Sequence, residues 1–164
     1  MKQLTGVLRE IDNVSIITYS TRQKVILTSV PANRKDIIIS AIDSIKTGGF
    51  TYGVEGIGKA YEIATAEFIP SGNNQVILAT DGMFNSPDYS LPDLLSEIRK
   101  RKSEGIIISV IGFGIDTEGI KTGKKIAKSG GGSFLQILNE VNAKSTLIDE
   151  IMQKSLKPGL KIKK

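Results

Sequence analysis

The chain lacks two reactive residue types, since none of its 164 residues is a cysteine or a histidine. Without cysteine there are no disulfides, no thiolate nucleophiles and no zinc held by thiolates. Without histidine, the commonest general base and the commonest transition-metal ligand are missing. Any metal ion must therefore be held by oxygens, which favours Mg²⁺, Ca²⁺ or Mn²⁺, and both absences argue against hydrolases of the triad type.

Aromatic residues and long apolar runs are also scarce. Aromatics make up 5% of the chain and none is interleaved with the lysines, so stacking on nucleic-acid bases has little support. No apolar run approaches the roughly 18 residues of a membrane helix. The first four residues are too short and too polar for a signal peptide. We therefore expect a cytosolic protein or one whose targeting segment is absent from this chain.

The remaining composition is that of one globular domain, with 40% apolar and 24% charged residues. We expect the domain over residues 1–156 and a frayed basic tail over 157–164. Residues 1–100 carry ten basic and eleven acidic groups, and residues 101–164 carry twelve basic and six acidic ones. The excess of basic groups in residues 101–164 indicates a lysine-rich face exposed to solvent. The alternative interpretation is a patch that binds nucleic acid or anionic lipid.

Short apolar runs alternate with helical patterns along the chain. Helical spacing of apolar residues is found at 38–45, opened by Asn33, at 54–68, at 90–98, where Ser90 and Asp93 form a capping pattern, and at 142–155. The runs 14–19, 25–27, 75–79 and 106–112 predict strands, and a Gly130–Gly132 turn precedes a fifth at 133–137. The run 106–111 has no alternating polarity, so we expect it to be covered on both faces.

This alternation predicts an α/β fold with a doubly wound, mostly parallel sheet flanked by helices. Only the pair within residues 14–27 is close enough for an antiparallel hairpin at the edge. In such sheets ligands bind beyond the carboxyl ends of the strands, where segments 19–21, 47–53 and 80–82 converge. Asp81 is a natural ligand for a hard cation there, and Thr51 offers a hydroxyl. The alternative is that both residues have structural roles, Asp81 in forming a turn and Thr51 as a helix N-cap.

Residues Gly53–Ala60 nearly match the phosphate-binding G-x-x-x-x-G-K-[ST] loop. The match fails at Ala60, which has no hydroxyl for Mg²⁺, and no apolar strand runs into Gly53. A P-loop-like NTPase or a phosphatase is therefore an alternative function rather than the leading one. The stretch Asp88-Tyr89-Ser90 is better interpreted as the turn and cap of the helix at Ser90.

Four segments of the chain are informative when taken together: NVSIITYS at 13–20, TGGFTYG at 47–53, VILATDG at 76–82 and SVIGFG at 109–114. They resemble von Willebrand factor type A domains, of the bacterial type. The likeness runs from about Leu4 to Ile151 and implies a Rossmann-like six-stranded sheet that binds protein partners. It also implies a metal-ion-dependent adhesion site, in which a divalent ion, usually Mg²⁺, keeps one position for a partner's carboxylate.

In that family the site takes an Asp-x-Ser-x-Ser after the first strand, a Thr in the glycine loop and an Asp after the fourth strand. Thr51 and Asp81 match the last two. The first motif is absent, because residues 4–11 look like the end of the helix that should follow it. We therefore predict an N-terminally truncated domain with two metal ligands, Thr51 and Asp81, and weak or no binding of Mg²⁺, Mn²⁺ or Ca²⁺ by this chain alone.

The absent first strand is central in the family's sheet, between the strands at Val14 and Gln75. Three outcomes are open. The two strands can pair directly, or another chain or a second copy can supply a strand to the unpaired edges. The third outcome, which we favour, is that the chain is an incomplete fragment. The leading function is a non-catalytic protein-binding module whose ligand offers an acidic side chain. The alternatives are an NTPase or phosphatase, and an electrostatic nucleic-acid or membrane-surface binder through residues 99–164.

Overall fold

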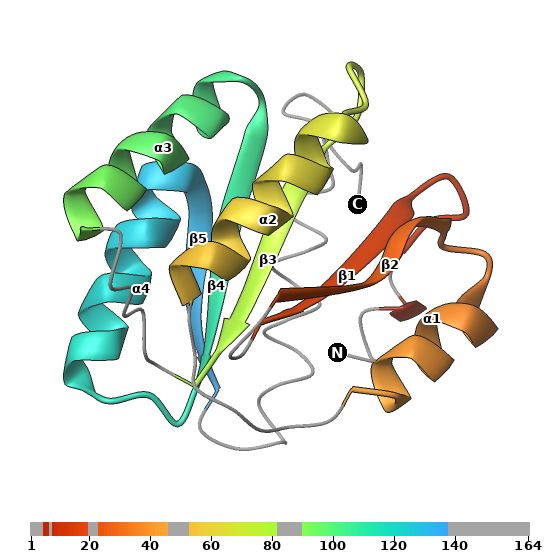
Figure 1. Ribbon diagram of the computed structural model, residues 1–164, viewed down its shortest axis with the longest axis horizontal. Coiled ribbons are helices and arrows are strands. Elements are labelled where there is room, and N and C mark those ends of the chain that lie inside the picture. Colours follow the sequence, from red (N-terminus) through yellow and green to blue (C-terminus); the bar gives the residue numbers. More distant parts are fainter. Residues whose placement is uncertain (1–4, 7, 20–22, 46–52, 82–89, 138–164) are drawn as a thin grey trace, which may run out of the picture.

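The computed structural model describes residues 5–6, 8–19, 23–45, 53–81 and 90–137. These residues form strands and helices that alternate over most of the chain, as the sequence predicts (Figure 1). In chain order they are β1 (Asn13–Tyr19), β2 (Gln23–Pro31), α1 (Lys35–Asp43), α2 (Gly53–Ala66), β3 (Asn74–Thr80), α3 (Leu91–Ser103), β4 (Ile106–Phe113), α4 (Thr117–Gly130) and β5 (Gly131–Ile137).

Strands β3, β4 and β5 form a parallel sheet with β4 in the middle. Along β4, Ile106, Ile108 and Val110 alternate with Ser109 and Ile111, and all five side chains are buried. The prediction that this run is covered on both faces is therefore confirmed. The buried Ser109 hydroxyl accepts hydrogen bonds from the Gln75 side chain at 3.1 Å and from the Ser133 amide at 3.2 Å, so it links all three strands.

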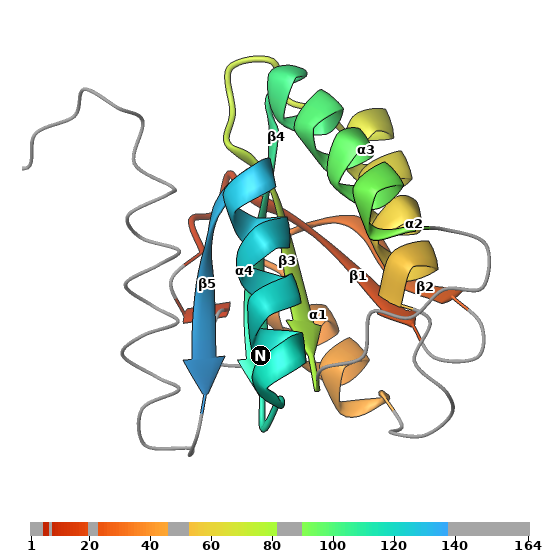
Figure 2. The same cartoon turned by 90° about the vertical axis from the view of Figure 1, so that its left-hand side faces the viewer.

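Helices α2, α3 and α4 lie side by side on one face of this sheet (Figures 1 and 2). Their inward side chains meet those of β3 and β4 in one apolar cluster, which supplies most of the favourable burial energy. The cluster comprises Val54, Ile57, Tyr61, Val76, Leu78, Leu94, Ile98, Ile106, Ile108, Val110, Ile126 and Ala127.

Helix starts show where the local prediction holds and where it fails. Ser90 is the N-cap of α3 and accepts a hydrogen bond from the Asp93 amide, which confirms the predicted cap. For α1 the N-cap is Arg34, with no capping side-chain bond, so the predicted opening at Asn33 is wrong. Helix α2 ends at Ala66, and Phe68, expected on its apolar face, lies beyond the helix and is 36% exposed.

Helix α4 has no counterpart among the predicted helices. Asp116 caps it through a 2.7 Å bond from the Gly119 amide. Its inner face carries glycines where other helices carry apolar side chains, because it packs very close to the sheet: a Cβ at Gly123 would lie 2.6 Å from the Phe134 ring. Gly131, in the left-handed conformation, ends the helix, and β5 begins there instead of at Ser133.

Strands β1 and β2 pair as an antiparallel hairpin, as predicted. Their register shifts twice, between Val14 and Ile16 and between Ile16 and Ile17. Ser29 has a positive φ of 50°, and its amide donates to the Ser15 hydroxyl at 2.9 Å. These irregularities bend the hairpin and increase its local twist.

The described strands fall into two separate sheets, β1–β2 and β3–β4–β5. Strands β1 and β3 run in the same general direction and both pack against α2, but they are not paired with one another as neighbouring strands of a sheet (Figure 1). Direct pairing of the two inner edges, the first of the three outcomes, is therefore wrong for the described residues.

Two further expectations concern the ends of the chain. Residues 4–11 are predicted to end a helix, and of the described ones only 5–6 are helical, with 3₁₀ geometry. Residues 9–12 form a turn in which the Asp12 amide donates to the Arg9 carbonyl at 2.9 Å. The Arg9 guanidinium and the Asp12 carboxylate pair at 2.7 Å and close this turn. The helix expected at 142–155 and the tail at 157–164 lie outside the described residues.

Candidate functional site

The candidate site lies at the edge of the sheet where β3 ends. The strand is buried up to Thr80, and the next residue, Asp81, is exposed. The side chain of Asp81 therefore reaches solvent at the carboxyl end of a buried parallel strand. That is the edge at which open α/β sheets bind their ligands.

Tyr19 brings the end of β1 to the same edge. Its hydroxyl donates to the Ala79 carbonyl oxygen at 2.6 Å, so this hydrogen bond joins the two sheets. Burial of the ring raises the pKa of Tyr19; a hydrogen bond with Thr80 opposes this, and the nearby charge of Asp81 adds to it. Asp81, Thr80 and Tyr19 are thus electrostatic neighbours.

The first turns of α2 complete this arrangement. A Cβ at Gly56 would lie 2.7 Å from the Tyr19 Cβ, so only glycine allows α2 to approach β1 so closely. Three segments therefore meet here, from the ends of β1 and β3 and the start of α2, as the sequence indicates. Of the predicted ligands, Asp81 lies at this edge, whereas Thr51, two residues before α2 begins, lies outside the described residues.

The donors that the described residues offer around Asp81 fit a divalent cation poorly. They are one carboxylate and the hydroxyls of Thr80 and Tyr19, and Tyr19 already donates to Ala79. Within the described ranges no three Asp, Glu, His or Cys residues cluster in a way that could hold a metal ion. Mg²⁺ prefers six oxygens with carboxylate charge, so this part of the site does not form a metal cage by itself.

Two other sequence features now have a structural place. Residues Gly53–Ala60, the near match to a phosphate loop, lie entirely within α2 and form no loop that could cradle a phosphate. The basic stretch from Arg99 to Lys102 lies near the C-terminal end of α3, where cations complement the helix dipole. Among the described residues, no helix is both long enough and apolar enough to cross a bilayer.

A shallow groove lies elsewhere, between α1 and β2, with a volume of about 480 Å³. Its lining contains both apolar and polar residues and includes neither Tyr19 nor Asp81, so it is separate from the candidate site. The lining residues are Ile26, Leu27, Asp36, Ile37, Ser40, Ala41 and Ser44.

Comparison with known proteins agrees with the geometry. The family model of the von Willebrand factor type A domain matches residues 1–151. The Escherichia coli (strain K12) protein named Uncharacterized protein YfbK is 34% identical over 153 residues, which are 93% of this chain. The chain spans 27% of the length of that relative.

Solved structures share the fold at lower identity. A von Willebrand factor type A protein from Catenulispora acidiphila superposes with a TM-score of 0.73 at 18% identity, covering 90% of this chain and 35% of that one. Proximal thread matrix protein 1 from the mussel byssus, with a zinc-occupied adhesion-site motif, gives a TM-score of 0.63 at 24% identity, covering 90% and 38%. By sequence and by fold, the chain belongs to the von Willebrand factor type A domain family.

Proposed function

We propose that this domain is a protein-binding module whose partner docks at the sheet edge around Asp81. The observation that carries the proposal is the exposed Asp81 carboxylate, which directly follows the buried strand β3. Domains of this family are generally non-catalytic interaction modules. Open α/β sheets bind their ligands at this edge. The chain contains neither histidine nor cysteine, so it lacks the commonest general base and the thiolate nucleophile.

We further propose that Thr51 and Asp81 are the metal ligands of an incomplete adhesion site. Support comes from their match to the family's motifs and from the relative whose motif holds zinc. With one carboxylate and one threonine hydroxyl, the site holds Mg²⁺ or Mn²⁺ weakly or not at all in this chain alone. A longer chain that adds the missing motif would bind the ion more tightly.

Calorimetric titration with Mg²⁺ and Mn²⁺ tests the metal proposal. We expect no heat of binding at micromolar metal for the wild-type chain, for Asp81→Ala or for Thr51→Ala. Micromolar affinity that disappears in Asp81→Ala would overturn the view that the site is incomplete. Lys35→Ala, an exposed change on α1, is the matched control for non-specific effects.

Selection of random peptides on the immobilised domain tests the binding proposal. The selection is done with enough Mg²⁺ to fill even a weak site, because an ion held by Asp81 can then bridge to a carboxylate of the peptide. We expect the enriched peptides to contain Asp or Glu, and to bind Asp81→Ala at least about tenfold more weakly than wild type, which corresponds to about 1.4 kcal/mol. The control Lys35→Ala should retain full affinity. Peptides that bind Asp81→Ala as well as wild type would place the docking surface elsewhere.

Self-association is a second candidate, favoured by the inner edges of β1 and β3. Neither edge has a strand partner among the described residues, and exposed strand edges recruit other strands. Light scattering measures this directly: a second copy that supplies a strand predicts a dimer whose fraction rises with concentration. A folded monomer at all concentrations would count against it.

A further inference from the structure

The end of the molecule opposite Asp81 has a different chemistry. In parallel α/β units the helix-to-strand junctions lie where strands begin, whereas Asp81 lies where β3 ends. Three such junctions meet there, from α2 to β3, from α3 to β4 and from α4 to β5 (Figure 1). We call this region the junction end and define it as residues 66–74, 99–105 and 125–131.

Two neighbouring apolar side chains are exposed at the junction end: Phe68 is 36% and Ile69 42% accessible. The loop that carries them is held in place, because the Asn74 side chain bonds both the amide and the carbonyl of Ile69 at 2.9 Å. Gly72 donates a third bond to the Ile69 carbonyl at 2.9 Å. Because hydrogen bonds fix this loop while Phe68 and Ile69 stay exposed to water, the loop is a candidate contact surface.

The apolar tip contacts the end of α3, and α3 in turn contacts the end of α4. The Phe68 ring lies against Gly105, just after α3, since a Cβ there would come within 3.3 Å of the ring. The Lys102 side chain packs against the end of α4, as shown by the 2.9 Å that would separate its Cε from a Cβ at Gly131. The tip and the last turns of α3 and α4 therefore form one continuous surface.

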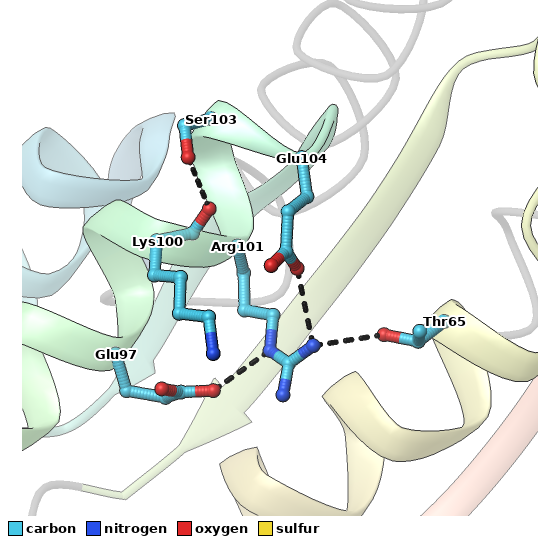
Figure 3. A network of polar contacts seen from close by, with 6 residues as sticks. All are labelled: Thr65, Glu97, Lys100, Arg101, Ser103 and Glu104. Atoms are coloured by element: carbon cyan, nitrogen blue, oxygen red, sulfur yellow. Dashed lines mark hydrogen bonds and ion pairs between the residues drawn. The ribbon is translucent and has the colours of Figure 1, made fainter.

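Most cations of the junction end have no acidic partner among the described residues. Arg101 is the exception: Glu97 and Glu104 accept its hydrogen bonds at 2.7 and 3.1 Å, and it also donates to Thr65 on α2 at 3.4 Å (Figure 3). Five other basic residues at this end are exposed and have no ion pair among the described residues: Arg99, Lys100, Lys102, Lys125 and Lys128. The acids of the junction end are Glu67 and Glu104, and Glu104 is committed to Arg101.

We propose that the junction end docks on the surface of an anionic phospholipid bilayer. The cations attract the phosphate and carboxylate groups of the lipid headgroups, and Phe68 and Ile69 enter the boundary between headgroups and acyl chains. A bilayer accepts both parts of this surface. A nucleic-acid backbone would use the cations but offers little apolar surface to Ile69, which makes it the less suitable partner.

This attachment is peripheral and leaves Asp81 at the opposite end of the sheet. A partner can then bind at the Asp81 edge while the junction end is in contact with lipid. The inference does not depend on the function proposed for Asp81, so Asp81→Ala should bind vesicles as wild type does.

Co-sedimentation with vesicles tests the proposal. We expect binding to phosphatidylcholine vesicles that contain about 30% phosphatidylserine, no binding to phosphatidylcholine alone, and weakening as salt is raised. Lys100→Glu with Lys128→Glu should reduce the affinity by at least about tenfold. Ile69→Ser should reduce it severalfold without changing the charge. Circular dichroism confirms that each variant is folded.

The double variant Lys24→Glu with Lys35→Glu, on β2 and α1, is the matched control, because it changes the net charge equally at another surface. It should keep most of the vesicle affinity. The proposal is overturned if no vesicle binding occurs, if this control loses as much affinity as the junction-end variant, or if Ile69→Ser has no effect while duplex DNA binds more tightly than the vesicles.

Discussion

The sheet of β3, β4 and β5 and the hairpin of β1 and β2 differ in how they are held. Seven hydrophobic residues of the parallel sheet are buried, whereas the buried hydrophobic residues include none from β1 or β2. Helices α2, α3 and α4 cover the sheet, while the hairpin rests on α2 and the short helix α1. The seven are Val76, Leu78, Ile106, Ile108, Val110, Ile111 and Ile137.

Backbone regularity follows the same division. The register between β3 and β4 runs unbroken over seven residue pairs and that between β4 and β5 shifts once, whereas that between β1 and β2 shifts twice. A strand that is buried on both faces cannot slip without turning apolar side chains toward water, but a half-exposed hairpin tolerates irregular pairing. Most of the folding free energy therefore resides in the parallel sheet, and the hairpin depends on its contacts with α2.

The largest expected effect compares the same substitution in the two regions. Ile108→Ala, in β4 at 0% exposure, should lower the free energy of unfolding by about 4 kcal/mol, because it leaves a cavity in the main cluster. Ile16→Ala, in the half-exposed β1, should cost about 1 kcal/mol. Urea unfolding followed by circular dichroism measures both. Equal losses would show that the hairpin is as well packed as the sheet.

The next effect concerns the joint between the two regions. Gly56→Ala should destabilise by about 2 kcal/mol, because the new methyl group would lie 2.7 Å from the Tyr19 Cβ and push β1 away from α2. Gly58→Ala is the control two residues along the same helix, where nothing lies within 4 Å. It should stabilise by up to about 1 kcal/mol, as alanine favours helix.

Hydrogen exchange locates the Gly56→Ala effect. Amides of β1 and β2 should lose protection, while those of β4 keep it. Uniform loss of protection over both sheets would contradict a hairpin that can open by itself.

The smallest effects come from two tyrosines, of which one hydroxyl is hydrogen-bonded and the other, among the described residues, is not. Tyr19→Phe removes the bond to Ala79 and should cost about 1 kcal/mol at neutral pH. The buried Tyr61 hydroxyl has no hydrogen-bond partner within the described residues, so Tyr61→Phe should leave stability unchanged or raise it by up to about 1 kcal/mol. Urea unfolding measures both, and an equal cost would show that Tyr61 has a partner.

The same variants carry a pH dependence. Burial raises the pKa of both phenols, so the folded state favours the neutral form. Their contribution to stability is complete below the unfolded pKa of about 10 and declines as pH rises above it. Each Phe variant should therefore lose less stability than wild type between neutral pH and about pH 10.5. A decline as steep as that of wild type would contradict the assigned burial.

Local patterns were sufficient for the strands and for most of the helices. The apolar runs at 75–79 and 106–112 are β3 and β4, because continuous apolar residues are stable only where both faces are covered. The cap at Ser90 could be predicted because it needs only a hydroxyl three residues before the free amide of Asp93, which the local sequence contains. The position of Asp81 followed from the rule that the carboxyl ends of parallel strands share one edge.

Other features could not be predicted from local patterns. Helix α4 is not predicted because its inner face carries glycines, which lower helix propensity. Gly123 packs close to β4 and β5, and Gly130 packs close to β4. Phe68 continued the apolar spacing of α2, yet the helix ends at Ala66. The hydrogen bond from Tyr19 to Ala79 joins residues 60 positions apart, so no local signal could indicate it.

By itself, the sequence determined the fold class, the order of the elements, the place of Asp81 and the exclusion of cysteine and histidine chemistry, because these depend on residue type and short-range spacing. Only the tertiary structure decided that the sheet divides between β1 and β3, that Tyr19 connects the two parts, and that Phe68 and Ile69 gather with unpaired cations at the end opposite Asp81. Those features depend on packing between distant segments, whose close approach is set by side-chain volume and backbone hydrogen bonding rather than by any local pattern.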